Sequence, residues 1–304
     1  MAFDFIQFAD PQFGMFDDLS KLPLHRWNGF LNRLRDAGAL QTGAPDPVRD
    51  PVDGIEPEID RMQWAVGRAN DHRPAFVVIC GDLVNNVDQP AQLDALRQTT
   101  AQIQTDILLH LIPGNHDLSL DGSAPTPDAL SAYRDSFHDD FFSFTVEDTH
   151  FLALNSETLH RPEHLPDEAP RQFEFIADSL SSRPAREAGR IIAFTHTPLF
   201  LRDPEQRQPG AISGDYRRKL VELFTASGVE AVFSGHLHHN RTADADGLRQ
   251  IVSGPVGFPL AGRSGYTTVH VPDDPATPIQ YAYHEYPHDP NPTTTGPGSN
   301  QGDT

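Results

Sequence analysis

Aspartate, asparagine and histidine residues directly follow several apolar segments of this chain. The run 107–113 stops at Gly114-Asn115-His116-Asp117, which places an amide, an imidazole and a carboxylate in one loop. Three other apolar runs stop at Asp10-Pro11-Gln12, at Gly81-Asp82 and at Gly235-His236-Leu237-His238. In α/β sheets, ligands bind outside the carboxyl ends of the strands. Four strands tipped in this way predict a metal site at one sheet edge.

Oxygen and imidazole ligands without a thiolate suit Mn, Fe, Zn or Ni ions. A carboxylate shared by two such ions can hold them roughly 3.5–4 Å apart, so that they clamp a phosphate and generate hydroxide. A fifth apolar run, 190–194, adds His196 to the set. Each residue alone is more often structural, because a strand-end aspartate usually serves a turn and a lone histidine usually lies on the surface or in the core. The prediction depends on their combination.

The elements that must position these residues follow from hydrophobic periodicity. Strands are expected at 3–8, 75–80, 107–113, 141–146, 150–155, 190–194, 229–234, 248–252, 266–271 and 279–286. Helices are expected near 26–37, around 59–69, from Pro90 with Ile103 and Ile107 among its apolar markers, from Pro127, at 171–181 and at 215–227. The run 107–113 is expected to be a buried strand. This order predicts an α/β fold of four layers (α+β), a two-sheet β-sandwich flanked by helices.

No polar linker separates two apolar patterns, so residues 1–286 are expected to form a single domain. Residues 287–304 offer no apolar side chain to bury and are expected to form a disordered tail. The segment 15–56 is long for a loop, and its role, including that of a lid over the site, stays open.

The charge balance limits the partners. The chain has 43 Asp and Glu against 23 Lys and Arg, a formal charge of −20, which argues against a nucleic-acid backbone or an anionic membrane as its main partner. The single cysteine, Cys80, excludes an intramolecular disulfide and fits a reducing compartment; its place in an apolar run predicts a buried thiol. With no evident signal peptide or membrane span, a soluble cytoplasmic protein is expected. No apolar pattern marks an oligomer interface.

The combined pattern resembles a known family. The segments that resemble its five blocks are Asp10-Pro11-Gln12, Gly81-Asp82-Leu83-Val84-Asn85, Gly114-Asn115-His116-Asp117, His196 and Gly235-His236-Leu237-His238. The family is the calcineurin-like metallophosphoesterase superfamily, which implies a β-sandwich with a binuclear metal centre at the strand ends. Further segments resemble the calcineurin-like phosphoesterase domain-containing protein 1 group, whose members are regarded as serine/threonine protein phosphatases: 9–14, 80–83, 141–144, 154–156, 198–200 and 232–236.

The resemblance also implies roles for individual residues. Asp10, Asp82 and His238 would hold one metal, and Asp82 would bridge to a second metal held by Asn115, His196 and His236. His116 would lie near the leaving-group oxygen as general acid, with Asp117 orienting it. A metal-bridging hydroxide would displace the alcohol in line, without a covalent phospho-enzyme.

Gln12 departs from the wider superfamily, which has histidine two residues after the first aspartate. An amide oxygen is a weaker, harder ligand than imidazole, so the first site is expected to bind metal more loosely and to prefer Mn²⁺ over Zn²⁺. The expected cofactors are two divalent ions, Mn²⁺ in the first place, with Fe, Zn or Ni left open. Asn85 stands where purple acid phosphatases have an iron-binding tyrosine, which disfavours that subfamily; a phosphate contact and a turn are both open for Asn85.

The leading functional prediction is a metal-dependent phosphomonoesterase acting on phosphoserine, phosphothreonine or small phosphate monoesters. A cyclic-nucleotide or other phosphodiesterase using the same centre is the first alternative, and a non-catalytic scaffold is the second. The expected partner is a phosphorylated protein or a small phosphoester. The loop 254–258 is expected to line the pocket near His238. His239 is expected to face solvent or to contact the metal ligands without binding a metal itself.

Overall fold

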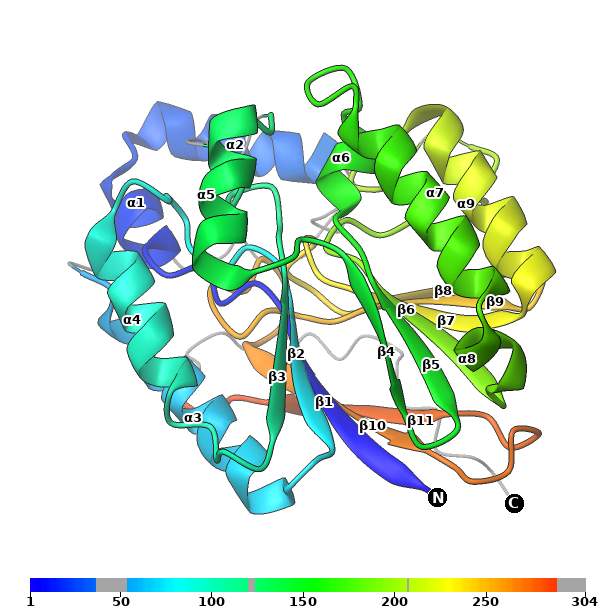
Figure 1. Cartoon of the computed structure of the whole chain (residues 1–304). Helices are drawn as coiled ribbons and strands as arrows, with labels where there is room; N and C mark the ends of the chain where they lie inside the picture. The colour runs from blue at the N-terminus through cyan, green and yellow to red at the C-terminus, as the bar shows by residue number, and fades with distance from the viewer. Residues whose placement is uncertain (37–53, 120–123, 207, 289–304) are drawn as a thin grey trace.

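Two mixed β-sheets pack face to face in the computed structural model of the chain (Figure 1). The structure describes residues 1–36, 54–119, 124–206 and 208–288. The first sheet has the strand order β11-β10-β1-β2-β3, and the second has the order β4-β5-β6-β7-β9-β8. The strands are β1 (Phe3–Phe8), β2 (Phe76–Cys80), β3 (Leu108–Ile112), β4 (Phe142–Val146), β5 (Thr149–Ala153), β6 (Arg190–Phe194), β7 (Val229–Ser234), β8 (Arg241–Ala245), β9 (Leu248–Val252), β10 (Gly265–Val271) and β11 (Gln280–Glu285).

Parallel pairing fixes where the functional loops meet. Strands β1, β2 and β3 are mutually parallel, as are β5, β6, β7 and β9. Parallel neighbours end at the same edge, so the loops that leave β1, β2 and β3 are brought together, and so are those that leave β6 and β7. The remaining strands extend the sheets in antiparallel fashion at their margins.

Aromatic side chains fill the space between the two sheets. Phe5 stacks on Phe76 with ring centroids 4.9 Å apart, and its edge meets Phe194 at 5.5 Å and Phe233 at 5.4 Å. All four rings are completely buried. This aromatic layer joins β1 and β2 of one sheet to β6 and β7 of the other, which are the strands that carry most of the predicted ligands.

Helices cover both outer faces of the sandwich, as predicted (Figure 1). Helices α3 and α4 pack on the first sheet, and α7 and α9 pack on the second, each through apolar residues at helical spacing. Helices α1 and α2 pack on the loop that contains Phe258 and Leu260. The helices are α1 (Met15–Lys21), α2 (Leu24–Asp36), α3 (Glu56–His72), α4 (Pro90–Thr100), α5 (Pro127–Phe137), α6 (Ser156–His160), α7 (Glu168–Ser181), α8 (Arg183–Glu187) and α9 (Gly214–Ser227).

Two details of the predicted elements are wrong. Strand β3 is the last strand of its sheet, and the Leu108 side chain is 57% exposed rather than buried. Helix α4 ends at Thr100, so Ile103 and Ile107 lie beyond it, although both are buried against the same apolar cluster. Their spacing matches a helix by coincidence. The chain makes two turns after α4, and these turns place Ile103 and Ile107 against the apolar cluster on which α4 also packs.

The short elements α1, α6, α8 and β8 were not predicted. Each has seven residues or fewer, and β8 is a polar strand at a sheet margin whose residues are alternately half-buried and exposed. Among the described residues, no helix has the length and apolar character needed to cross a bilayer. Residues 37–53 of the open segment 15–56, and 289–304 of the predicted tail, lie outside the described ranges. That 1–286 forms one domain stays a prediction.

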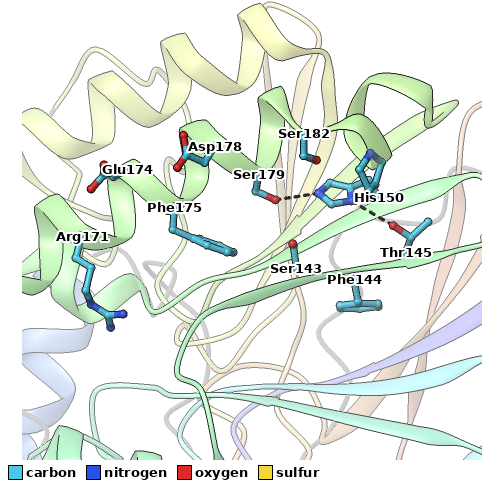
Figure 2. A pocket seen from close by; sticks show the side chains of 11 residues that line it. Ser143, Phe144, Thr145, His150, Arg171, Glu174, Phe175, Asp178, Ser179 and Ser182 are labelled. Carbon is cyan, nitrogen blue, oxygen red and sulfur yellow. Dashed lines mark hydrogen bonds between the residues drawn. The ribbon is translucent and has the colours of Figure 1, made fainter.

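A groove of about 550 Å³ lies between β4, β5 and α7. His150, only 3% exposed, sits at one end of it, between Thr145 and Ser179 (Figure 2). The His150 Nδ1 atom is 3.3 Å from the Thr145 hydroxyl oxygen, and Nε2 is 3.0 Å from the Ser179 hydroxyl oxygen. The groove is lined mostly by residues of regular strands and helices, and none of the predicted metal ligands is among its described lining residues.

Candidate metal centre

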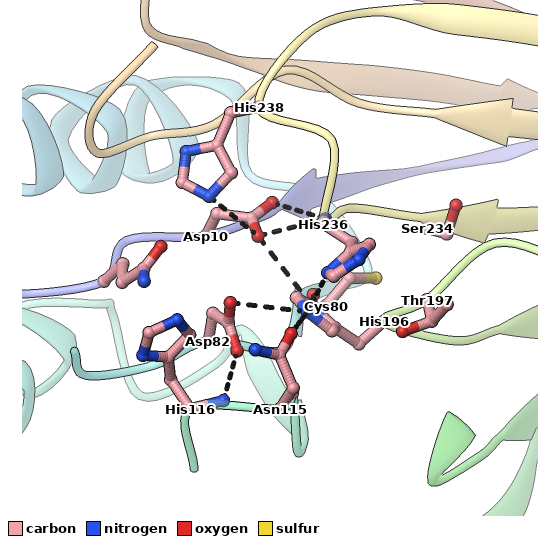
Figure 3. A network of polar contacts seen from close by, with 12 residues as sticks. Asp10, Cys80, Asp82, Asn115, His116, His196, Thr197, Ser234, His236 and His238 are labelled. Atoms are coloured by element: carbon pink, nitrogen blue, oxygen red, sulfur yellow. Dashed lines mark hydrogen bonds and ion pairs between the residues drawn. The ribbon is translucent and has the colours of Figure 1, made fainter. Parts of the chain in front are cut away.

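The predicted ligands converge from the ends of five strands (Figure 3). The loop after β1 supplies Asp10, the loop after β2 supplies Asp82, and the loop after β3 supplies Asn115. The loop after β6 supplies His196, and the loop after β7 supplies His236 and His238. Parallel order within each sheet, and the packing of the sheets, bring side chains together that lie up to 228 residues apart in sequence.

One group of side chains gathers around His196, which is fully buried. Its Nε2 atom lies 3.4 Å from Asp82 Oδ2, 3.0 Å from Asn115 Oδ1 and 3.2 Å from His236 Nδ1. Its Nδ1 atom lies 3.0 Å from the carbonyl oxygen of Cys80, which accepts a hydrogen bond from that nitrogen. The bond to Cys80 leaves Nε2 as the nitrogen that can act as a ligand.

A second group contains Asp10, Asp82 and His238. The His238 Nε2 atom is 3.5 Å from Asp10 Oδ1, and its Nδ1 atom donates to the carbonyl oxygen of Phe258 at 2.5 Å. One ligand atom from each member can be chosen so that all three lie within 4.8 Å of one another, and the same holds for Asp82, His196 and His236. Asp82 therefore belongs to both groups, the arrangement that a bridging carboxylate requires.

The backbone is held in an unfavourable conformation at these residues. Of the nine non-glycine residues with positive φ in the described ranges, five are predicted ligands: Asp10 (46°), Gln12 (37°), Asp82 (49°), His236 (71°) and His238 (53°). A positive φ costs side-chain-bearing residues free energy, and such residues concentrate at functional sites. The sharp turns that follow the strands thus direct these side chains to a common point.

Two glycines permit close approach of backbone to ligand. A Cβ atom on Gly114 would lie 2.3 Å from Asp82 Oδ1, and one on Gly235 would lie 2.4 Å from Asp10 Oδ2. The backbone N–H of His236 donates to both oxygens of Asp10 at 3.0 Å, and that of His116 donates to Asp82 Oδ1 at 2.9 Å. Each acidic side chain is therefore oriented by the backbone of a neighbouring loop.

The electrostatics of the centre favour a bound cation. Burial raises the pKa of Asp10 well above its usual range, in spite of the opposing effect of His196. Burial is the largest single influence on Asp82 and disfavours its ionised form, but His196 and His116 together outweigh burial and hold the pKa of Asp82 below its usual range. Burial lowers the pKa of His196, yet the carboxylates of Asp82 and Asp10 raise it to about 10. Burial lowers the pKa of His238 to about 4, which keeps that imidazole neutral. A divalent ion would supply the positive charge that the buried carboxylates lack, so the donor set fits such an ion.

Asp117 does not contact His116 in the way that was expected. Its buried carboxylate accepts hydrogen bonds from the backbone N–H groups of Leu83 (2.9 Å) and Gly114 (2.7 Å), and so ties the loop after β2 to the loop after β3. Burial and the neighbouring Asp82 raise the pKa of Asp117 to about 7. His116 is oriented instead by a backbone carbonyl, because its Nδ1 atom donates to Asn85 O at 2.8 Å.

The surroundings of His238 agree with the expectation for the loop 254–258, whose last residue, Phe258, binds the His238 ring. His239 is partly buried and its Nδ1 atom contacts the carbonyl oxygen of Leu237 at 2.8 Å, away from the ligand groups. Sequence reasoning missed the carbonyl groups of Cys80, Asn85 and Phe258, since a backbone acceptor leaves no mark on residue type.

Known proteins resemble this chain in sequence. The sequence model of the family described as calcineurin-like phosphoesterase matches residues 7–240. The chain is 31% identical over 265 residues to a Bos taurus protein named serine/threonine-protein phosphatase CPPED1, with 85% of this chain and 76% of the relative covered. The Homo sapiens protein of the same name is 31% identical over 266 residues, with the same coverage.

Solved structures resemble the fold. A dimetal phosphatase from Danio rerio has a TM-score of 0.61 at 16% identity, covering 90% of this chain and 93% of that one. The purple acid phosphatase PPD1 from Lupinus luteus seeds has a TM-score of 0.63 at 16% identity, covering 94% of this chain and 52% of that one. At this identity the likeness concerns the two-sheet architecture alone.

Proposed function

Because the chain belongs to the calcineurin-like phosphoesterase family, we propose that it is a metal-dependent phosphomonoesterase that hydrolyses phosphoserine, phosphothreonine or small phosphate monoesters. The family and the phosphatase-named relatives make the protein a phosphoester hydrolase. The observation that carries the proposal is the pair of ligand groups that share Asp82, placed beside His116. Mononuclear sites do not need a shared carboxylate, whereas a two-ion phosphoesterase does.

We assign the metal ligands by their place in the two groups. Asp10, Asp82 and His238, with Gln12, would hold the first ion, and Asp82, Asn115, His196 and His236 would hold the second. Two divalent ions, when bound, supply Lewis-acid polarisation of the phosphoryl oxygens and a water of lowered pKa. The oxygen-rich first group favours Mn²⁺.

His116 is assigned as the general acid. Because its Nδ1–H donates to the carbonyl oxygen of Asn85, the proton available for transfer is the one on Nε2. That nitrogen would protonate the leaving alkoxide oxygen of the substrate. Asp117 supports the reaction indirectly, since its carboxylate holds the loops that carry Asp82 and His116.

The proposed partner is a phosphorylated protein or a small phosphoester. The formal charge of −20 disfavours a nucleic-acid backbone. The lone thiol, Cys80, is completely buried and favours a reducing compartment, which is why we propose the cytoplasm.

The test is hydrolysis of p-nitrophenyl phosphate by the chelator-stripped full chain, without metal and with Mn²⁺, Fe²⁺, Zn²⁺, Ni²⁺ or Mg²⁺ added. We expect turnover to return with Mn²⁺ above all, and phosphoserine and phosphothreonine peptides then to be substrates. Bis-p-nitrophenyl phosphate is the matched diester. Turnover of the diester alone would replace the proposal by a phosphodiesterase, and folded protein that is silent with every metal would favour a scaffold.

A further inference from the structure

Three polar side chains form a chain of hydrogen bonds from the surface to the metal centre. Asp18, exposed on α1, accepts from the Asn85 side-chain amide through its Oδ2 atom. The Asn85 Oδ1 atom in turn accepts from Gln12 Nε2 at 2.9 Å. Gln12 is 1% exposed and follows Asp10 by two residues. The Asn85 amide therefore lies between the Asp18 carboxylate and the amide of Gln12, a predicted ligand.

The direction of this chain is set by Asp18. A carboxylate accepts hydrogen bonds and cannot donate them, so it must meet the NH₂ group of Asn85. The Asn85 carbonyl oxygen is then turned toward Gln12, where it can accept from an NH₂ group only. Gln12 must therefore point its side-chain nitrogen toward Asn85, and its side-chain oxygen lies on the opposite side of the amide.

That oxygen meets no donor in the part of the chain that the structure describes. Among the described residues, Gln12 Oε1 is a buried atom without a hydrogen-bond partner. Such an atom is costly to bury unless a ligand meets it. A metal ion can bind the oxygen of an amide, whereas the NH₂ group has no lone pair to offer.

We infer that Asp18 and Asn85 are positioning residues that fix the orientation of the Gln12 amide, so that its oxygen and not its nitrogen faces the first metal. The inference rests on the proposed function, because it concerns the ion that the proposed function requires. It identifies a determinant of metal affinity outside the ligand set.

Asn85 connects the relay, by which we mean the hydrogen-bonded side chains of Asp18, Asn85 and Gln12, to the proposed proton donor His116. The backbone carbonyl of Asn85 accepts from His116 Nδ1 while its side chain binds Gln12. Helix α1, which carries Asp18, is itself anchored from α3, because Glu58 Oε1 accepts from the backbone N–H groups of Gly14 (3.1 Å) and Phe16 (2.9 Å). The relay is thus held at Asn85, its middle member, and at the helix that carries Asp18.

The first variant is Asp18→Asn, which replaces an obligate acceptor by an amide that can present either group. Both downstream amides are then free to turn over. We expect the Kd for Mn²⁺ at the weaker site to rise about 10–100-fold, the usual effect of losing a partner that orients a metal ligand. The measurement is calorimetric titration of the chelator-stripped full chain with Mn²⁺, with the thermal unfolding midpoint recorded to confirm folding.

The matched controls separate orientation from charge. Asp88→Asn removes the same charge from an exposed aspartate three residues after Asn85, and should leave the Kd unchanged. Gln12→Glu presents an oxygen whichever way its carboxylate turns, so adding Asp18→Asn in that background should no longer weaken Mn²⁺ binding. The double variant Asp18→Asn/Asn85→Asp exchanges the carboxylate and the amide between the two positions. The carboxylate introduced at position 85 can then only accept a hydrogen bond from Gln12, so the affinity for Mn²⁺ should be restored.

The outcomes distinguish this inference from the proposed function. A wild type that binds two Mn²⁺ ions, with Asp18→Asn binding them equally well, overturns the relay and leaves the phosphoesterase proposal intact. An equal loss in the native and Gln12→Glu backgrounds would also overturn it, because the effect would then be one of charge. A wild type that binds no Mn²⁺ overturns the proposed metal centre and the relay together.

Discussion

Two buried histidines show what separates the metal centre from the groove beside α7. His150 and His196 are both almost inaccessible, and each has a hydrogen-bond partner at both ring nitrogens. The partners of His150 are the hydroxyl groups of Thr145 and Ser179, whereas His196 faces two carboxylates as well as a carbonyl and an amide. Burial of an imidazole is therefore common to both regions, but of these two rings only that of His196 has carboxylate oxygens within 4 Å among the described residues.

The charge difference has opposite consequences for the two rings. Burial lowers the pKa of His150, so that this histidine is neutral and its hydroxyl partners satisfy it fully. Burial acts on His196 in the same direction, but Asp82 and Asp10 raise its pKa to about 10. A cluster that attracts a proton so strongly also attracts a divalent cation, which competes with protons for the same atoms.

The backbone differs in the same way. His150 lies within β5 and Ser179 within α7, at regular positions that any well-packed sheet and helix would provide. Asp10, Asp82 and His236 follow strand ends and have positive φ angles. Strain, acidic charge and convergence of several loops occur together only at the centre among the described residues. A histidine among fifteen gains a functional role from these surroundings and not from its own type.

The strongest test of this contrast is the paired removal of one group from each region. Asp82→Asn weakens both ligand groups, so the metal content of the purified protein should fall from about two ions toward zero and hydrolysis should be lost. His150→Ala should keep both ions, and should cost about 1–3 kcal/mol of stability because Thr145 and Ser179 lose their partner. Elemental analysis and chemical denaturation measure the two effects. One fully occupied ion in Asp82→Asn would show that Asp82 is not a bridge.

A smaller effect, confined to chemistry, is expected at His116. His116→Ala removes the proposed proton donor but keeps the backbone N–H that binds Asp82, so turnover of a phosphoserine peptide, whose alkoxide leaving group needs a proton, should fall about 10²–10⁴-fold while both ions stay bound. The rate loss should be much smaller for p-nitrophenyl phosphate, because p-nitrophenolate leaves without a proton. Loss of a metal ion from this variant would instead show that His116 is a metal ligand, and His116 would then be added to the ligand groups of the metal centre.

The smallest effect concerns His110, a histidine with aromatic neighbours and, within the described ranges, no carboxylate contact. Its ring stacks on Phe144 at 4.0 Å, and burial lowers its pKa to about 4. The unfolded chain binds a proton on this ring at a higher pH, near 6.5, so the contribution of His110 to stability is present above about pH 6.5 and is lost as the pH falls toward 4.

His110→Phe should abolish this loss. Relative to the wild type, the variant should gain stability steadily as the pH falls from about 6.5 to about 4, and the difference should be constant above that window. Urea denaturation of both chains at several pH values, without metal, measures it. A difference independent of pH would show that His110 does not titrate as the buried ring that its neighbours indicate.

The sequence by itself determined every strand of the described residues except β8, and which residues follow those strands. Strand ends such as Asp82 and Asn115 were predictable because an apolar run and the polar residue after it are adjacent in the chain, and the same holds for Gly235 before His236. The two-sheet architecture followed from the order of strands and helices together with the family resemblance. The identity of the bound metal and the role of each side chain stay proposals.

The tertiary structure alone decided which groups meet across long separations. Sequence order could not show that Asp117 binds backbone 34 residues away, that Asn85 orients His116 across 31 residues, or that Asp18 reaches Asn85 across 67. It could not show that β3 is an edge strand, because an apolar run has the same sequence pattern in a central strand and in an edge strand. These features depend on how loops pack against one another, and backbone donors and acceptors, which every residue carries, make most of those contacts.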